Sequence, residues 1–407
     1  MYAESLKCLQ CGREFDLSEI AYQCTMCGSP LEVKYNLKLI AERMSPSDLN
    51  NRKIYNMWRY SEFLPVDPDQ AVTLGEGFTP LVKAEGISKL MGVKNLYLKL
   101  DFISPTGSFK DRGSSLLVSK AIDVSSTTIA IDSSGNAAAS IAAYSAKAGL
   151  HCYVFTPSYA SIGKLIQAGM YGAEVIKVDG TRRDVFEVTT KACKELGWYY
   201  CGFQTNPFAS EGMKTIAFEI CEQMRWNPPE RIVFPVGTGS GIIGCWMALR
   251  LLKELGWIER LPSLVCVQPN GCAPIVRAHQ QGSEEIEVVD KPRTVAEGLM
   301  IGHPVKGKTV LRALNETNGL AASVSDVEIV EAAKWLAKSE GSFVEPSAAA
   351  SIAGLRRLIE EGEISPEERI VCILTGTGLK TVDAYSSLVR GLPQISPSME
   401  DVRRTLR

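Results

Sequence analysis

Residues 104–112 read Ser-Pro-Thr-Gly-Ser-Phe-Lys-Asp-Arg and place Lys110 directly behind a turn of small, hydroxyl-bearing residues. A lysine in this setting can be held in a polar pocket at the start of a helix. When neighbouring cations or loss of water lower the pKa of its ammonium group, the free amine can form a Schiff base. Taken alone, the stretch favours an exposed lysine in a turn, the commonest setting of a lysine. The other motifs of the chain are needed to distinguish a Schiff-base lysine from an exposed lysine.

Short runs rich in valine and isoleucine alternate with helical patterns from about residue 95 onward. Continuous apolar runs suit parallel strands that are buried on both faces. Their alternation with helices predicts an α/β fold with two open, mostly parallel sheets flanked by helices. The predicted strands are residues 95–100, 127–131, 152–155, 174–178, 231–236, 264–268 and 369–374, and the predicted helices are 137–148, 161–171, 183–196 and 326–339.

Two turns of small residues directly follow predicted strands. Residues 133–136 read Ser-Ser-Gly-Asn, and residues 237–241 read Gly-Thr-Gly-Ser-Gly. In open α/β sheets, ligands bind beyond the carboxyl ends of strands, against the free N–H groups of helix starts. The alternating glycines indicate a cup for one phosphate group, because the turn lacks both the P-loop lysine and the dinucleotide-binding spacing. Each turn also fits an ordinary helix cap or connection.

Cysteine is the one departure from average composition, with twelve residues of which four lie in the first 27. Cys8 and Cys11 form one Cys-x2-Cys pair, Cys24 and Cys27 form another, and a glycine follows each pair. This spacing is typical of a four-cysteine zinc ribbon whose closed site is structural. The alternatives are a hairpin whose thiols pair and a ribbon that has lost its metal. The other eight cysteines are scattered singly and indicate reduced core thiols.

The overall composition excludes several classes of protein. Hydrophobic residues make up 45% and charged residues 22%, as in an average globular chain. The formal net charge of −2 gives no sign of a nucleic-acid partner or an anionic membrane surface. No apolar run reaches the roughly 18 to 20 residues of a spanning helix, and the first residues lack the apolar segment of a signal peptide. We therefore expect a cytoplasmic protein without nucleic-acid or membrane partners.

A candidate Schiff-base lysine, an asparagine turn and a monophosphate cup together suggest pyridoxal phosphate. In order and spacing, the motifs resemble those of the fold-type II pyridoxal-phosphate enzymes, most closely the threonine synthase family, from about residue 8 to 385. The similar segments are residues 73–81, 105–113, 134–136, 206–208, 211–215, 344–347 and 375–380. The resemblance implies a lyase of threonine biosynthesis that converts O-phospho-L-homoserine and water to L-threonine and phosphate. It also implies a homodimer.

The resemblance assigns a role to each site residue. Lys110 is expected to hold the cofactor as a Schiff base and to move protons at Cα and Cβ of the substrate. Asn136 is expected at the cofactor's ring hydroxyl and Thr375 at its pyridine nitrogen, which a hydroxyl group leaves largely unprotonated. The phosphate cup is expected to consist of Gly237, Thr238, Gly239, Ser240 and Gly241. The expected substrate-binding residues are Thr106, Ser133, Ser134, Gly135, Asn206 and Lys214.

The resemblance also implies a domain organisation. The four-cysteine ribbon takes residues 1–40, as in some members of the family. A large pyridoxal-phosphate-binding α/β domain is expected from residues 41–115 and 205–407. A smaller α/β domain, residues 116–204, is expected to carry the Ser-Gly-Asn turn.

Several positions depart from the usual pattern of the family. Thr238 and Gly241 stand where asparagine is usual, Thr377 replaces a histidine, and residues 301–304 read Ile-Gly-His-Pro in place of Ile-Gly-Asn-Pro. These departures keep alternatives open: a serine or threonine ammonia-lyase, a β- or γ-replacement synthase acting on another amino acid, and a non-catalytic binder on an enzyme fold.

The largest departure follows the Asn-Pro-Phe segment, where Ala209 and Ser210 replace the usual arginine and leucine. An arginine binds a phosphate group through two parallel hydrogen bonds, so its loss removes a natural clamp for a substrate phosphate. The candidates for its replacement are Lys164, Arg182, Arg183, Lys214 and His303.

Overall fold

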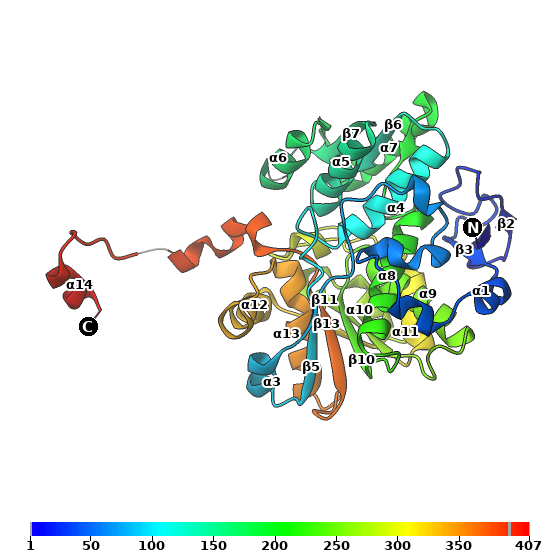
Figure 1. Cartoon of the computed structure of the whole chain (residues 1–407). Coiled ribbons are helices and arrows are strands. Elements are labelled where there is room, and N and C mark those ends of the chain that lie inside the picture. The colour runs from blue at the N-terminus through cyan, green and yellow to red at the C-terminus, as the bar shows by residue number, and fades with distance from the viewer. Residues whose placement is uncertain (1, 159, 161, 390–391, 407) are drawn as a thin grey trace.

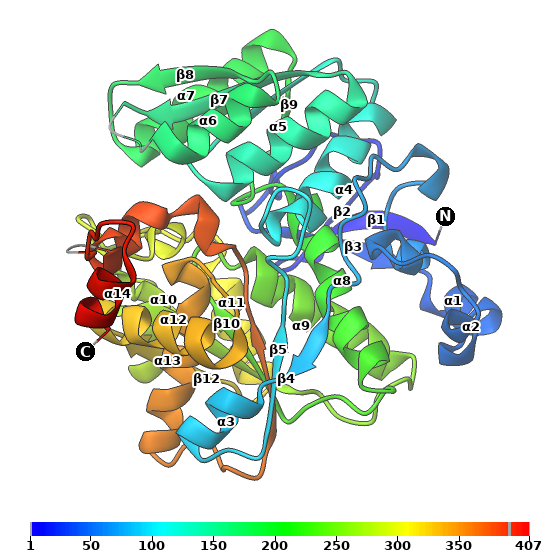
Figure 2. The same ribbon diagram turned by 60° about the vertical axis from the view of Figure 1, so that its left-hand side comes forward.

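The computed structural model describes residues 2–158, 160, 162–389 and 392–406. Three sheets organise the chain (Figures 1 and 2), with strand orders β2-β1-β3, β12-β11-β10-β13-β5-β4 and β8-β7-β6-β9. In the large sheet only the β4–β5 pair is antiparallel, and all pairs of the four-stranded sheet are parallel. The predicted α/β fold with two open, mostly parallel sheets is confirmed.

All seven predicted strands are present, with ends that differ by no more than two residues. The large sheet contains β4 (Leu81–Lys83), β5 (Asn95–Lys99), β10 (Arg231–Pro235), β11 (Ser263–Pro269), β12 (Leu320–Val324) and β13 (Arg369–Ile373). The four-stranded sheet contains β6 (Thr128–Asp132), β7 (His151–Pro157), β8 (Glu174–Val178) and β9 (Tyr199–Tyr200). The N-terminal sheet contains β1 (Ala3–Cys8), β2 (Glu14–Phe15) and β3 (Leu31–Tyr35).

Helices cover the faces of both larger sheets in Figures 1 and 2. They are α1 (Leu37–Arg43), α2 (Pro46–Asn50), α3 (Glu85–Met91), α4 (Lys110–Asp123), α5 (Asn136–Ala148), α6 (Ile162–Met170), α7 (Arg182–Leu196), α8 (Pro207–Gln223), α9 (Ser240–Glu254), α10 (Pro274–Gln280), α11 (Gly307–Glu316), α12 (Asp326–Glu340), α13 (Pro346–Glu360) and α14 (Met399–Thr405). Among the described helices, none has the length and apolar character to cross a membrane.

The sheets take their strands from separate parts of the chain. The four-stranded sheet uses residues 128–200, and the large sheet uses residues 81–99 and 231–373. The domain boundary predicted between residues 115 and 116 falls inside α4, which continues across it. Helix α4 packs against both α5 and α8, so it joins the two sheet regions.

A fully buried ionic network lies directly behind the start of α4. The Arg112 guanidinium pairs with Asp101, with Nη2 and Oδ1 2.6 Å apart, and also with Glu219. The Lys99 amine is 2.6 Å from the second oxygen of Glu219. Burial alone would raise the pKa of Glu219, but the charges of Arg112 and Lys99 outweigh it and hold that pKa at about 2. The network ties α4 to β5 and α8, and so fixes the helix that begins at Lys110.

Replacing Glu219 with Gln is expected to lower the free energy of unfolding at pH 7 by about 3–5 kcal/mol, because it leaves Arg112 and Lys99 with too little negative charge. The pKa of Glu219 is lower in the folded protein, so its contribution is complete above the ordinary value of 4.5 and is lost as the pH falls toward about 2. Urea unfolding of both proteins should therefore give curves that converge between pH 5 and pH 2. A difference that stays constant over this range contradicts the assignment.

The control is Glu367→Gln, which breaks the exposed ion pair with Lys94, in which both side chains are about two-thirds exposed. We expect it to change stability by less than about 1 kcal/mol.

Candidate active site

The turn before Lys110 is held against the carboxyl end of β13. The Phe109 N–H group donates a hydrogen bond of 2.9 Å to the carbonyl oxygen of Thr375. Gly107 has a φ of +80°, and a Cβ atom at this position would come within 2.8 Å of the Thr377 methyl group. The turn therefore needs glycine, and it places Lys110 next to the segment that contains Thr375.

The Lys110 amine lies between two aromatic rings. Its Nζ atom is 4.3 Å from the ring centre of Phe203 and 4.9 Å from that of Phe109. Within the described residues it has no ion-pair partner within 4.0 Å. Burial lowers the pKa of Lys110 to about 8, although the charge of Glu345 acts in the opposite direction. Compared with an exposed lysine, much more of this amine is unprotonated near neutral pH, as a nucleophile requires.

The predicted phosphate cup, residues 237–241, lies beside the same two rings. The Ser240 hydroxyl donates to the carbonyl oxygen of Phe203 at 2.8 Å, and a Cβ atom at Gly241 would lie 3.1 Å from the Phe109 ring. In the described part of the chain, the N–H groups from Thr238 to Gly241 have no hydrogen-bond acceptor. Free N–H groups at the start of α9, a helix of 15 residues, form an anion-binding surface.

Asn136 begins α5 and faces Glu345. Its Nδ2 atom donates to both carboxylate oxygens of Glu345, at 2.9 and 3.1 Å, whereas its Oδ1 atom is buried without a partner among the described residues. The Glu345 N–H group donates to the carbonyl oxygen of Gly376 at 2.9 Å. Asn136 and Glu345 therefore meet the segment that follows Thr375. Glu345 was not predicted as a site residue, although residues 344–347 are one of the similar segments.

Two cations lie at the Ser-Ser-Gly-Asn turn. The Arg182 guanidinium donates to the Ser134 hydroxyl at 3.1 Å. The Lys164 side chain passes 3.9 Å from a Cβ atom built on Gly135, and its amine is 3.2 Å from a carboxylate oxygen of Glu297. Ser133 shapes the turn itself, since its hydroxyl accepts from the Gly135 N–H group at 3.2 Å.

Thr106 is engaged inside the turn before Lys110. Its hydroxyl donates to the Asp111 carboxylate at 2.5 Å, and its carbonyl oxygen accepts from Lys380 at 2.8 Å. Burial raises the pKa of Asp111 to about 6, although hydrogen bonds from Ser140 and Thr106 act in the opposite direction.

Two predicted substrate-binding residues, Asn206 and Lys214, contact groups within the protein. Asn206 caps α8: it accepts from the Phe208 N–H group at 3.1 Å, and its amide nitrogen donates to Tyr199 and Tyr200. Lys214 is fully buried and its amine is 2.6 Å from Glu211. The Asn206 amide is thus engaged at the start of α8 and the Lys214 amine forms an ion pair, and substrate binding by either side chain stays a prediction. Of the other cations considered for the lost arginine, Arg183 and His303 are exposed.

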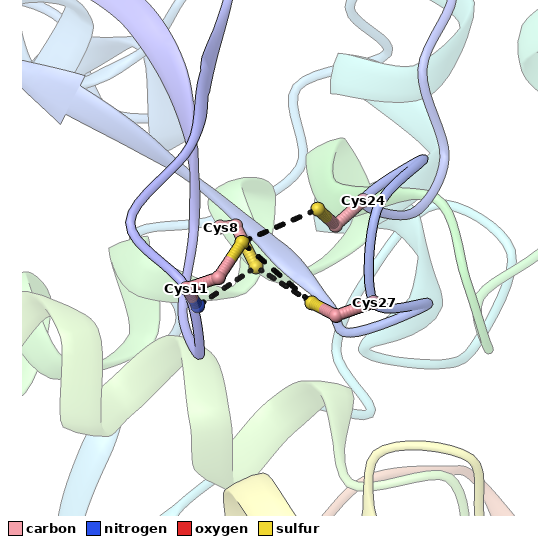
Figure 3. A group of neighbouring side chains, drawn as sticks. All are labelled: Cys8, Cys11, Cys24 and Cys27. Carbon is pink, nitrogen blue, oxygen red and sulfur yellow. Dashed lines mark hydrogen bonds between the residues drawn. The ribbon is translucent and has the colours of Figure 1, made fainter.

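The four N-terminal cysteines converge at one point (Figure 3). All four sulfur atoms lie within 4.8 Å of one another, with Cys8 and Cys27 3.5 Å apart and Cys11 and Cys24 3.6 Å apart. A tetrahedral zinc ion with Zn–S bonds of about 2.3 Å requires sulfur separations of roughly 3.8 Å. Gly12 and Gly28 have φ values of +74° and +69°, so each Cys-x2-Cys-Gly pair makes the same tight turn. This geometry can hold a metal ion.

Comparison with known proteins identifies the class to which this fold and site belong. The sequence profile of the family described as "Pyridoxal-phosphate dependent enzyme" matches residues 72–376, which include Lys110, the cup and Thr375. The chain belongs to this family. It is 42% identical to the threonine synthase of Methanocaldococcus jannaschii, over 98% of this chain and 99% of that protein. It is 39% identical to the threonine synthase of Methanosarcina acetivorans, over 98% of each chain.

Solved structures support the same fold. Maize serine racemase superposes with a TM-score of 0.66 at 22% identity, over 77% of this chain and 92% of that one. A fungal L-serine ammonia-lyase from Rhizomucor miehei also gives a TM-score of 0.66 at 22% identity, over 76% and 97% of the two chains. At this level of identity the likeness concerns the fold alone.

Proposed function

We propose that the chain is a threonine synthase, a pyridoxal-phosphate-dependent lyase that converts O-phospho-L-homoserine and water to L-threonine and phosphate. One observation carries the proposal: the identity of 39–42% to two threonine synthases extends over 98% of the chain. It includes the four-cysteine module, which lies outside the matched family profile.

The residues of the site fit pyridoxal phosphate. Lys110 offers an amine whose pKa is about 8, Asn136 has a buried oxygen without a partner, and the cup offers free N–H groups. Lys110 would bond to the aldehyde carbon, Asn136 and Thr375 would face the ring, and residues 237–241 would hold the phosphate group. When bound, the cofactor supplies a ring that stabilises negative charge on the amino acid joined to it.

The chain's own residues would then bind the substrate and move its protons. The free N–H groups at the start of α5 and the hydroxyls of Ser133 and Ser134 suit the substrate carboxylate. Lys164 and Arg182 stand at the same turn and suit the substrate phosphate. The Lys110 amine would take the proton from Cα and deliver protons as phosphate leaves Cγ and the hydroxyl of water adds at Cβ.

A substrate panel tests this proposal. Incubation with O-phospho-L-homoserine should release threonine and phosphate in equal amounts, while serine and threonine should yield no 2-oxo acid. Release of a 2-oxo acid and ammonia from serine or threonine, without any reaction of O-phospho-L-homoserine, contradicts the proposal and favours the ammonia-lyase. Transfer of an added thiol to another substituted amino acid favours a replacement synthase.

Three finer proposals accompany this function. We propose that the four N-terminal cysteines bind structural zinc, which the sulfur separations support. A cytoplasmic location is consistent with the twelve free cysteines, eight of them buried singly in the body of the protein. The proposal of a homodimer rests on the family resemblance, and light scattering of the purified protein tests it.

A further inference from the structure

Lys306 is a buried lysine that none of the similar segments contains. It lies directly before α11, is 3% exposed, and donates a hydrogen bond of 2.9 Å from Nζ to the Ser210 hydroxyl. No carboxylate oxygen of the described residues forms an ion pair with it within 4.0 Å. A buried ammonium group without a counter-charge is unfavourable, so this position lacks a negative partner.

The surroundings of Lys306 identify the space that such a partner would occupy. The Cβ atom of Lys306 lies 3.9 Å from a Cβ atom built on Gly239, the left-handed residue at the centre of the cup. Burial and the charge of Lys110 together lower the pKa of Lys306 to about 7, although Glu211 acts in the opposite direction. Lys306 therefore borders the cup and lies close enough to Lys110 for the two positive charges to repel each other.

We propose that Lys306 binds the phosphate group of pyridoxal phosphate in the 237–241 cup and that Ser210 is its positioning residue. A helix N-terminus supplies only about half a unit of positive charge, and a phosphate monoester carries up to two negative charges. Thr238 and Gly241 stand where the family usually has asparagine, so the cup has lost side-chain amide donors. Lys306 supplies the missing donor together with a full positive charge.

The same contact accounts for another departure. Ser210 stands where the family usually has leucine, and its hydroxyl accepts from Lys306 at 2.9 Å. A leucine at this position would leave the ammonium group without its hydrogen bond and next to an apolar side chain, which is costly inside a protein. The changes at positions 210, 238 and 241 thus form one consistent set around Lys306.

The inference rests on the cofactor of the family and not on the identity of the substrate, so its test uses cofactor binding. The cofactor is first removed from the wild-type holoenzyme and from the Lys306→Met holoenzyme. Each protein is then titrated with pyridoxal phosphate and with pyridoxal, which lacks the phosphate group. Schiff-base absorbance reports binding. The variant should bind pyridoxal phosphate on the order of 10- to 100-fold more weakly, as expected for one charge-assisted hydrogen bond, and pyridoxal with unchanged affinity.

Two further variants make the test specific. Lys308→Met removes an exposed lysine of the same helix, which pairs with Glu285, and should leave both affinities unchanged. Lys306→Gln keeps a donor for Ser210 and serves if Lys306→Met does not fold. Lys306→Gln should also bind pyridoxal phosphate more weakly, while its affinity for pyridoxal should stay unchanged.

An unchanged affinity for pyridoxal phosphate overturns the proposal, as does an equal loss for both ligands, which indicates general damage to the site. Weaker binding of O-phospho-L-homoserine with unchanged cofactor affinity would assign Lys306 to the substrate phosphate and overturn it as well. A failure of the substrate panel alone leaves the cofactor titrations valid, so the two proposals fail separately.

Discussion

Replacement of Lys110 with alanine is expected to lower kcat by about 1,000-fold or more and to abolish the adduct that borohydride reduces in the wild type. The amine is the group that bonds to the cofactor aldehyde and then moves protons, and positioned proton transfer alone contributes about 100- to 10,000-fold. Its pKa of about 8 follows chiefly from burial, so the amine is already partly unprotonated before it reacts. Stopped assays with O-phospho-L-homoserine and peptide mapping of the reduced protein measure both effects.

The control variant is Lys120→Arg, ten residues further along α4, where the amine binds Asp123 at the end of the helix. It should keep the adduct and most of the activity. A reduced adduct that persists in Lys110→Ala, or that maps to another lysine, contradicts the assignment of Lys110. A wild-type protein without the visible absorbance of a Schiff base contradicts the whole enzymatic interpretation.

The sequence predicted the parts of the fold that depend on local apolar pattern. Strands such as β10 and β13 contain continuous runs of buried apolar residues, so their positions follow from the local sequence. Strand β9 has two residues and β4 has three, too few to produce a pattern. Helix α8 is buried from Pro207 to Cys221, so it has no solvent-exposed face and its sequence lacks the amphipathic period that marks a surface helix.

The glycine-rich turn between β10 and α9 could be predicted from the sequence, since such a turn after a strand has few alternatives, and its binding of a phosphate group stays a prediction. The partners of long buried side chains could not be predicted from the sequence. Lys214 pairs with Glu211, and Tyr35, 176 residues from Glu211 in the chain, donates to the same carboxylate at 2.7 Å. Nothing local in the sequence indicates this cluster. Lys306 was missed for the same reason, although it follows the altered Ile-Gly-His-Pro segment and its partner Ser210 is itself a departure.

The N-terminal module contacts the rest of the chain at several points, and one of them is a carboxylate of α8. Glu211 of α8 accepts from the Val33 N–H group at 3.2 Å and from the Tyr35 hydroxyl at 2.7 Å, both in β3. Outside β3, the Tyr22 hydroxyl accepts from the Tyr200 N–H group at 2.8 Å, and the four cysteines, two of which are exposed, lie together. Metal binding should therefore stabilise the folded protein. None of the contacts described above joins the Lys110 side chain to the module.

Replacing Cys8 with serine is accordingly expected to reduce bound zinc from one ion per chain to nearly none and to lower the free energy of unfolding by on the order of 5 kcal/mol. This is less than the roughly 10–16 kcal/mol of isolated zinc-finger peptides, because β1 stays paired with β3 and β3 stays packed on α8. Elemental analysis and urea unfolding measure the two effects. Turnover per folded molecule should stay near that of the wild type, since a site with four protein ligands has no position left for a substrate.

The matched control is Cys193→Ala, which removes a buried thiol of α7 outside the cluster and should keep the zinc content unchanged. Cys27→Ser, at an exposed sulfur, should lose zinc as fully as Cys8→Ser, because a tetrahedral site needs all four thiolates whatever their burial. Unchanged zinc content in Cys8→Ser contradicts the site. A loss of turnover per folded molecule with unchanged stability contradicts the structural role, because it would mean that the ion acts on the reaction and not on the fold.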